Sequence, residues 1–108
     1  MTAMHEFKAD LFKTLGHPVR LRILELLRSG EKTVTELQQD LTIEASSVSQ
    51  QLAVMRSHQL VEARKLGTNV FYTVRDVLVF ELLDIARKIF ENRVESMKMV
   101  LDQDGTGD

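Results

Sequence analysis

Two short segments with helical spacing, joined by a tight polar turn, constrain the fold of this chain most strongly. Thr33 and Glu36 match a capping box, in which two side chains satisfy the first free N–H groups of a helix. Apolar residues then recur at helical spacing, which predicts two inward faces with only 42–44 between them: Val34, Leu37 and Leu41, and, within 45–58, Ala45, Val48, Leu52 and Met55. Two helices joined by so short a turn predict a helix-turn-helix.

Two more helical segments come first. Residues 4–15 have apolar side chains at helical spacing, and Gly16 is a suitable stop. Pro18 fits the first turn of a further helix, which we expect over 19–28 before Ser29-Gly30 ends it. Its expected apolar face is Val19, Ile23, Leu24 and Leu27.

The pattern changes after residue 58. β-forming residues lie on both sides of Leu66-Gly67-Thr68-Asn69 between Leu60 and Val74, which predicts a β-hairpin. A long helix follows over 76–101, with Asp76 as its cap. We therefore predict a mostly α-helical winged helix-turn-helix over residues 1–101, with the hairpin as the wing. Residues 102–108 are acidic, and we expect a disordered tail there.

The last helix has two apolar stripes, whereas a surface helix of a single domain has one. The first stripe consists of Leu78, Leu82, Ile85 and Ile89, and the second of Val79, Leu83, Ala86, Phe90, Val94, Met97 and Leu101. A chain of 108 residues is long enough to cover about one of these stripes, so we expect a second copy of the chain to cover the other. The alternative is a fully buried central helix. The expected dimer interface combines the first helix with the second stripe of the last helix: Phe7, Leu11, Val79, Leu83, Phe90, Val94 and Met97.

Composition excludes several classes of function. The chain has no cysteine, which excludes thiolate metal sites and cysteine nucleophiles. It has no glycine-rich phosphate loop, no HExxH pattern and no nucleophile-elbow serine, so we predict that it is not an enzyme. No apolar run approaches the roughly 18–20 residues of a membrane span, and no signal pattern opens the chain. We expect a cytoplasmic protein with no membrane partner.

The distribution of charge matters more than its sum. The formal net charge is −2, but three acidic groups lie in the last eight residues, so the first 100 residues carry +1. The outward face of 45–58 has serines, Gln50 and Ala53 but no acidic residue. Serine hydroxyls can contact phosphates or base edges, a glutamine can pair with adenine, and an alanine admits a thymine methyl group. This pattern favours a recognition helix over a merely polar surface helix.

The hairpin adds basic residues beside that face. Arg64 and Lys65 suit phosphate or minor-groove contacts, which supply affinity without reading sequence. Arg56 suits either a phosphate contact or an intramolecular ion pair. The residues that we expect to contact double-stranded DNA are Ser46, Ser47, Ser49, Gln50, Gln51, Ala53, Arg56, Arg64, Lys65 and Thr68.

Several motifs occur in a fixed order over residues 4–95. They are Leu15-Gly16-His17-Pro18-Val19-Arg20-Leu21-Arg22-Ile23-Leu24, Val34-Thr35-Glu36-Leu37, Ser46-Ser47-Val48-Ser49-Gln50-Gln51-Leu52, Met55-Arg56, and Leu60-Val61 followed by Gly67 and Val70-Phe71-Tyr72. This ordered set resembles the ArsR/SmtB family of bacterial repressors. The resemblance implies a homodimer bridged by its first and last helices on an inverted repeat, with half-sites about one helical turn or a multiple apart. It also implies that the protein represses its own operon and leaves DNA when a signal arrives.

The known sensor sites of that family are absent from this sequence. Thr33 and Thr35 stand where thiolate sensors carry Cys-x-Cys. When Asp76 is aligned as the first ligand of the zinc and nickel site, apolar Leu78 and Ile89 fall at two of the other positions, and such side chains cannot ligate a metal. His17 suits a structural or capping role at its helix entry.

We therefore predict no cofactor, with one alternative left open. His5 could meet Glu91 or Glu95 across a dimer and form an unusual nickel or zinc site. The function predicted from the sequence is a sequence-specific, autoregulatory DNA-binding repressor. The alternatives are a nickel- or zinc-responsive repressor and a winged-helix interaction module that does not bind DNA.

Overall fold

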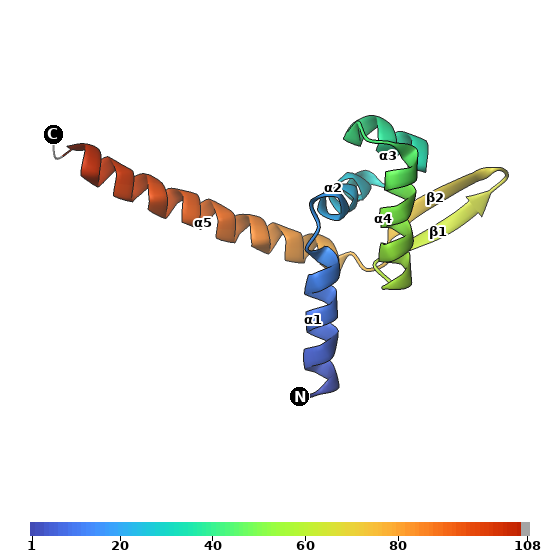
Figure 1. The fold of residues 1–108 in the computed structure, drawn as a ribbon, viewed down its shortest axis with the longest axis horizontal. Helices are drawn as coiled ribbons and strands as arrows, with labels where there is room; N and C mark the ends of the chain where they lie inside the picture. The colour runs from blue at the N-terminus through green and yellow to red at the C-terminus, as the bar shows by residue number, and fades with distance from the viewer. Residues whose placement is uncertain (107–108) are drawn as a thin grey trace. The chain divides into compact units, whose positions relative to one another are not determined.

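The computed structural model describes residues 1–106 and divides the chain into two units, one ending at Val77 and one beginning at Leu78. The mostly helical architecture with one hairpin confirms the predicted winged helix-turn-helix (Figure 1). The first unit has four α-helices, a short 3-10 helix (η1) and two strands; the second is one long helix. In order they are α1 (Ala3–Leu15), α2 (Pro18–Leu26), η1 (Leu27–Ser29), α3 (Val34–Leu41), α4 (Ala45–Ser57), β1 (Val61–Leu66), β2 (Asn69–Val74) and α5 (Leu78–Thr106).

Local capping explains where the first helices begin and end. The side chain of Thr2 accepts from the backbone N–H of His5 at the start of α1. His17 Nδ1 accepts from the N–H of Val19 at 3.2 Å, which confirms the capping role expected for this histidine. The helix that we expected over 19–28 is regular only as far as Leu26 and then tightens into η1, which ends at Gly30 with φ of 133°. Such a φ favours glycine.

The helix-turn-helix begins with the predicted capping box. Thr33 Oγ1 accepts from the N–H of Glu36 at 3.2 Å, and Glu36 Oε1 accepts from the N–H of Thr33 at 3.0 Å. The Thr33 N–H and the Thr33 hydroxyl, which also donates to Oε1 at 3.1 Å, hold the pKa of the Glu36 carboxyl below its ordinary value of 4.5. Thr42 ends α3 in the left-handed region, with φ of 55°.

Helix α4 ends in a Schellman motif. The N–H of Leu60 donates to the carbonyl of Met55 at 2.8 Å, and the N–H of Gln59 donates to that of Arg56 at 3.0 Å. Gln59 has φ of 61°, and the buried Leu60 and Met55 accompany the turn. This compact end directs the chain from α4 straight into β1.

The wing is an antiparallel hairpin, as the sequence predicted. Val61 pairs with Val74 and Leu66 with Asn69 around a two-residue turn, in which Gly67 has φ of 64°. Lys32, just before α3, adds an isolated bridge to Tyr72 through two backbone hydrogen bonds of 2.8 and 3.1 Å. These hydrogen bonds attach the wing to the segment before α3, and the chain itself attaches it to the end of α4.

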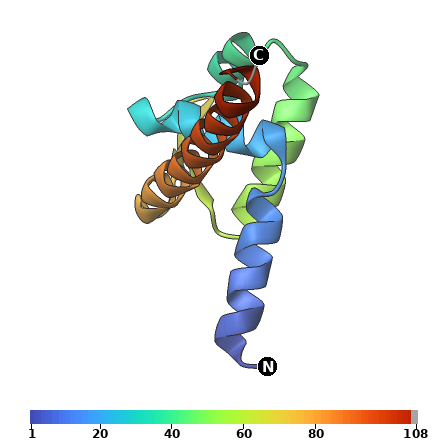
Figure 2. The same ribbon diagram turned by 90° about the vertical axis from the view of Figure 1, so that its left-hand side faces the viewer.

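The core of the first unit lies between α2, α3 and α4, which pack on one another (Figure 2). Apolar periodicity identified most of it correctly, although Val19, Val34 and Ala45 are only half-buried. The fully buried side chains lie in these three helices and at the start of β1: Ile23, Leu24, Leu37, Val48, Leu52, Met55 and Val61. Thr14 is the buried polar residue of this unit among those the structure describes.

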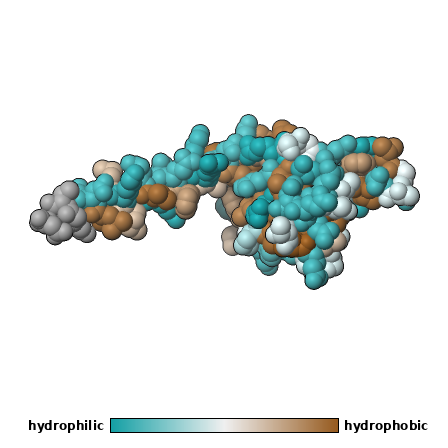
Figure 3. Space-filling model, turned by 90° about the horizontal axis from the view of Figure 1, so that it is seen from above, coloured by the Kyte–Doolittle hydropathy of each residue, from teal (hydrophilic) through white to brown (hydrophobic). Residues whose placement is uncertain are grey.

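The second unit, α5, leaves most of its apolar side chains in solvent. Phe90 is 65% exposed, and Val94, Met97 and Leu101 are exposed as well. Figure 3 shows such side chains in brown along α5 as far as the grey atoms. The helix continues to Thr106, past Leu101, so residues 102–106 of the expected tail are helical; residues 107–108 lie outside the described residues. No helix in the described part of the chain has the length and apolarity to cross a membrane.

Candidate nucleic-acid interface

The outward face of α4 is polar, uncharged over most of its length and accessible. Val48, Leu52 and Met55 are buried, which directs the opposite side of the helix to solvent. The predicted contact residues Ser46, Ser47, Ser49, Gln50 and Ala53 are all exposed there. No acidic residue occurs between Ala45 and Ser57.

The two adjacent glutamines of α4 have different environments. Gln50 is exposed on the outward face. Gln51 is half-buried, and its Oε1 accepts a hydrogen bond from Arg20 Nε at 2.8 Å. Gln50 therefore lies with the exposed serines on the outward face, whereas Gln51 is hydrogen-bonded to α2. A DNA contact by Gln51 stays a prediction.

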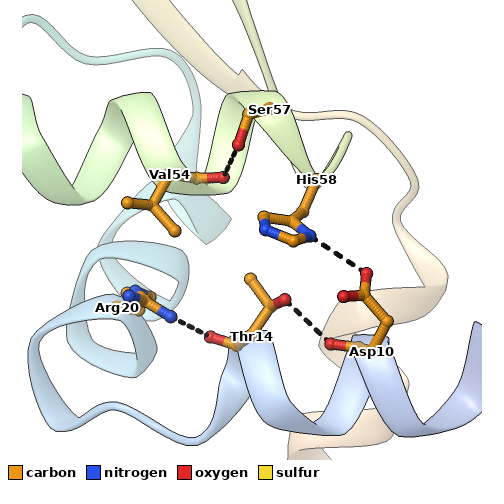
Figure 4. Close-up of polar contacts among 6 residues, drawn as sticks. All are labelled: Asp10, Thr14, Arg20, Val54, Ser57 and His58. Carbon is orange, nitrogen blue, oxygen red and sulfur yellow. Dashed lines mark hydrogen bonds and ion pairs between the residues drawn. The ribbon is translucent and has the colours of Figure 1, made fainter.

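An open groove separates α4 from β2. Arg56 lies at this groove and is exposed, and within residues 1–106 no acidic side chain pairs with it. Of the two roles expected for Arg56, the geometry favours the phosphate contact. The Ser57 hydroxyl donates to the carbonyl of Val54 at 2.8 Å (Figure 4).

The groove is lined by Ser49, Leu52, Ala53, Arg56, Ser57 and Tyr72. Tyr72 was not among the predicted contacts, because its position beside α4 depends on how the wing packs.

The basic residues of the wing differ in how free they are. Lys65 and Thr68 are exposed near the turn. Arg64 is held by Glu31, with Nη2 2.7 Å from Oε1, and its guanidinium carbon lies 5.2 Å from the centroid of the Phe71 ring. Arg75, at the base of the wing, donates to Gln59 Oε1 at 2.9 Å and lies 3.6 Å from Glu62. Lys65 is thus the wing cation most accessible to a phosphate.

The residues expected at a dimer interface are exposed to different degrees. Phe7 on α1 is 63% exposed, and Phe90, Val94 and Met97 on α5 are exposed. Leu11 and Leu83 are half-buried, and Val79 is buried in the single chain. The exposed residues of this set are large and apolar, which is unusual for helix faces that stay in contact with water.

The described residues contain no cluster of three or more potential metal ligands in the single chain. His5 Nδ1 lies 2.8 Å from Thr2 Oγ1, and Glu91 accepts from Arg87 Nε at 3.1 Å. Glu95 is exposed. A nickel or zinc site that joins these residues across a dimer stays a prediction.

Comparison with known proteins identifies the family. Residues 17–63 match the arsR family of bacterial regulatory proteins. The uncharacterized HTH-type transcriptional regulator Rv0081 of Mycobacterium tuberculosis is 40% identical over 100 residues, which cover 92% of this chain and 88% of the relative. The chain belongs to the ArsR family. It is therefore a winged-helix DNA-binding transcriptional regulator and not an enzyme.

Two solved structures and a further sequence relative are similar to this chain. The crystal structure of Rv0081 is 39% identical, with a TM-score of 0.79 over 89% of this chain and 97% of that one. The solution structure of a homodimeric winged helix-turn-helix DNA-binding domain from Mycobacterium bovis has a TM-score of 0.77 at 29% identity, over 86% of each chain. The biofilm growth-associated repressor of Xylella fastidiosa is 39% identical over 76% of this chain and 72% of its own.

Proposed function

We propose that this ArsR-family regulator is a repressor that binds an inverted-repeat operator as a homodimer and that its own upstream DNA carries such an operator. Each protomer places α4 in a major groove and its wing on the flanking backbone. Relatives described as a repressor and as a homodimeric DNA-binding domain support this proposal. Two-fold symmetry of the protein then requires two half-sites of opposite direction.

The observation that carries the proposal is the acid-free outward face of α4 with Arg56 at its edge and Lys65 on the neighbouring wing. A solvated helix normally gains stability and solubility from glutamate, lysine and arginine, whereas serine is a poorer helix former. A face of small hydroxyl groups without negative charge allows close approach to the edges of bases and to phosphates. The major groove of B-DNA, about 12 Å wide, admits one helix.

The residues divide into two kinds of contact. In this proposal Gln50 and Ala53 read base edges, and Ser46 and Ser49 assist them. Arg56, Lys65 and Thr68 bind phosphates, which gives affinity without sequence information. Arg64 joins the second group when it leaves Glu31.

The apolar side chains of α1 and α5 support the homodimer. Phe7 and Phe90 are exposed in the single chain, as are Val94 and Met97. Covering them with a second copy removes apolar area from water, which stabilises association by roughly 25 cal/mol for each Å². The same contacts hold two recognition helices together in one dimer.

Binding to DNA tests the proposal directly. Fluorescence anisotropy with the duplex upstream of its own gene, and with a random duplex of equal length, should show selective binding that weakens as salt rises. Lys65→Glu should weaken binding to both duplexes, and the matched reversal Lys88→Glu on α5 should leave it nearly unchanged. Repeating the titration in chelator, nickel and zinc tests the metal-responsive alternative. Absence of binding to any duplex at low salt contradicts the proposal and favours an interaction module.

A further inference from the structure

The attachment of α1 to the rest of the first unit is confined to its last turns. Thr14 and Leu15 are the buried residues of α1, and residues 1–10 are exposed. A helix of 13 residues is about 20 Å long, so an apolar anchor at one end leaves its direction loosely determined. Polar contacts near that end therefore decide how α1 is directed relative to α4.

The first such contact is made by Arg20 of α2. Its Nη1 donates to the carbonyl oxygen of Thr14 at 3.1 Å, and its Nε donates to Gln51 Oε1 at 2.8 Å. One guanidinium thus joins the end of α1 to the middle of α4, and its planar, rigid set of donors makes both contacts directional. Figure 4 shows Arg20 directed at the Thr14 carbonyl.

The second contact joins α1 to the end of α4. His58 Nδ1 lies 3.0 Å from Asp10 Oδ2, and the two side chains face each other in Figure 4. Asp10 is one helical turn before Thr14, whose hydroxyl donates to the Asp10 carbonyl at 2.8 Å. Gln51 and His58 are about two turns, or roughly 10 Å, apart along α4. Two attachment points at that separation fix a direction, whereas one fixes only a position.

We infer that the Arg20 and Asp10–His58 contacts set the spacing between half-sites that the dimer accepts. This inference rests on the proposed homodimer, in which α1 contributes to the interface and α4 occupies the groove. The direction of α4 relative to α1 then determines the distance and rotation between the two recognition helices. One base pair changes the separation of half-sites by about 3.4 Å and about 34°. Asp10, Arg20, Gln51 and His58 are positioning residues in this scheme.

The test compares operators that differ only in spacing. Selection from a random duplex library with the wild-type protein supplies the half-site and its preferred spacing. Dissociation constants are then measured for that duplex and for versions with one base pair inserted or removed at the centre. For the wild type we expect binding to the altered duplexes to be about ten-fold weaker, the effect of a mismatched contact.

The variants are Asp10→Ala and Arg20→Met, alone and together. Glu6→Ala removes the same charge from α1, and Arg22→Met makes the same change on α2, so these are the matched controls. We expect the ten-fold spacing penalty to fall by about two- to five-fold in Asp10→Ala, in line with the energy of exposed charged contacts. It should fall at least as much in Arg20→Met, because the contacts of Arg20 are half-buried, and further in the double variant. Asp10→Asn, which can still accept from His58, should retain most of the penalty. Thermal unfolding and sedimentation identify variants that remain folded and dimeric.

The outcomes separate the inference from the proposed function. Equal weakening at every spacing, or an unchanged penalty in folded, dimeric Asp10→Ala and double variants, overturns the inference while the proposed function stands. Selection of no inverted repeat by the wild type overturns the proposed function itself. A reduced penalty in the variants but not in Glu6→Ala or Arg22→Met supports the inference.

Discussion

The guanidinium of Arg64 on the wing and the carboxylate of Glu31 before α3 form a bidentate ion pair. Arg64 Nη2 lies 2.7 Å from Oε1 and 2.9 Å from Oε2 of Glu31, and Nε lies 3.3 Å from Oε2. Phe71, opposite Arg64 in the hairpin, supports the guanidinium from its ring face. The arginine that sequence analysis assigned to a phosphate is thus partly neutralised in the DNA-free protein.

Removing the charge of Glu31 should therefore strengthen DNA binding. In Glu31→Gln the guanidinium of Arg64 no longer has to leave a carboxylate before it reaches a phosphate. Exposed ion pairs are worth about 0.2–1 kcal/mol, so we expect affinity for cognate and random duplexes to rise by up to about five-fold. Anisotropy titrations measure this, with Glu25→Gln on α2 as the control for a general change in charge. Weaker binding by Glu31→Gln would instead mean that Glu31 holds Arg64 in its DNA-binding position.

Gln50→Ala should reduce sequence preference more than affinity for random DNA. A glutamine that pairs with adenine contributes about 1–3 kcal/mol of discrimination, so cognate binding should fall by roughly ten-fold or more. Lys65→Ala is the contrasting variant, because loss of a phosphate contact weakens all sequences alike and lowers the salt slope by about one. Equal losses by Gln50→Ala on cognate and random duplexes would contradict its assignment to base reading.

Local signals explain why most of the fold was predictable. The Thr33–Glu36 capping box lies within one helical turn, and the register of the hairpin follows from a two-residue turn at Gly67. Such features depend on neighbours in sequence. The apolar period likewise identified Val48, Leu52 and Met55 as the buried face of α4, which fixes its outward face by default.

The contacts that the sequence did not reveal join residues far apart in the chain. Glu31 with Arg64, Arg20 with Gln51 and Asp10 with His58 are 33, 31 and 48 residues apart. Whether polar side chains meet over such separations depends on the angles between packed elements, which apolar periodicity does not specify. The sequence therefore assigned Arg64 and Gln51 to DNA contacts without revealing that Glu31 and Arg20 bind them in the DNA-free protein.

The capping box should make stability depend on pH. The pKa of Glu36 is lowered in the folded protein, chiefly by its hydrogen bond with the Thr33 N–H, so the folded state favours the ionised carboxylate. This contribution is present above the ordinary pKa of 4.5 and is lost as pH falls through the lowered value. Glu36→Gln keeps a hydrogen-bonding side chain but no charge, so its melting temperature should lie below the wild type near neutral pH and approach it in acid. Titration of the Glu36 carboxyl carbon by NMR at or above 4.5 would contradict the stabilisation of its ionised form by the capping box.

Phe90→Glu should separate the dimer without unfolding the protomer. Phe90 is 65% exposed in the single chain, so a charge there costs little until a second copy covers it. At an apolar interface the same charge is desolvated without a partner, which costs several kcal/mol in real proteins. Sedimentation should show a monomer with native helix content by circular dichroism, and operator binding should fall steeply because the two half-sites are no longer linked. Lys88→Glu, on the polar side of α5, should stay dimeric. A dimeric Phe90→Glu protein that still binds the operator would place the interface on a different surface from the second stripe of α5.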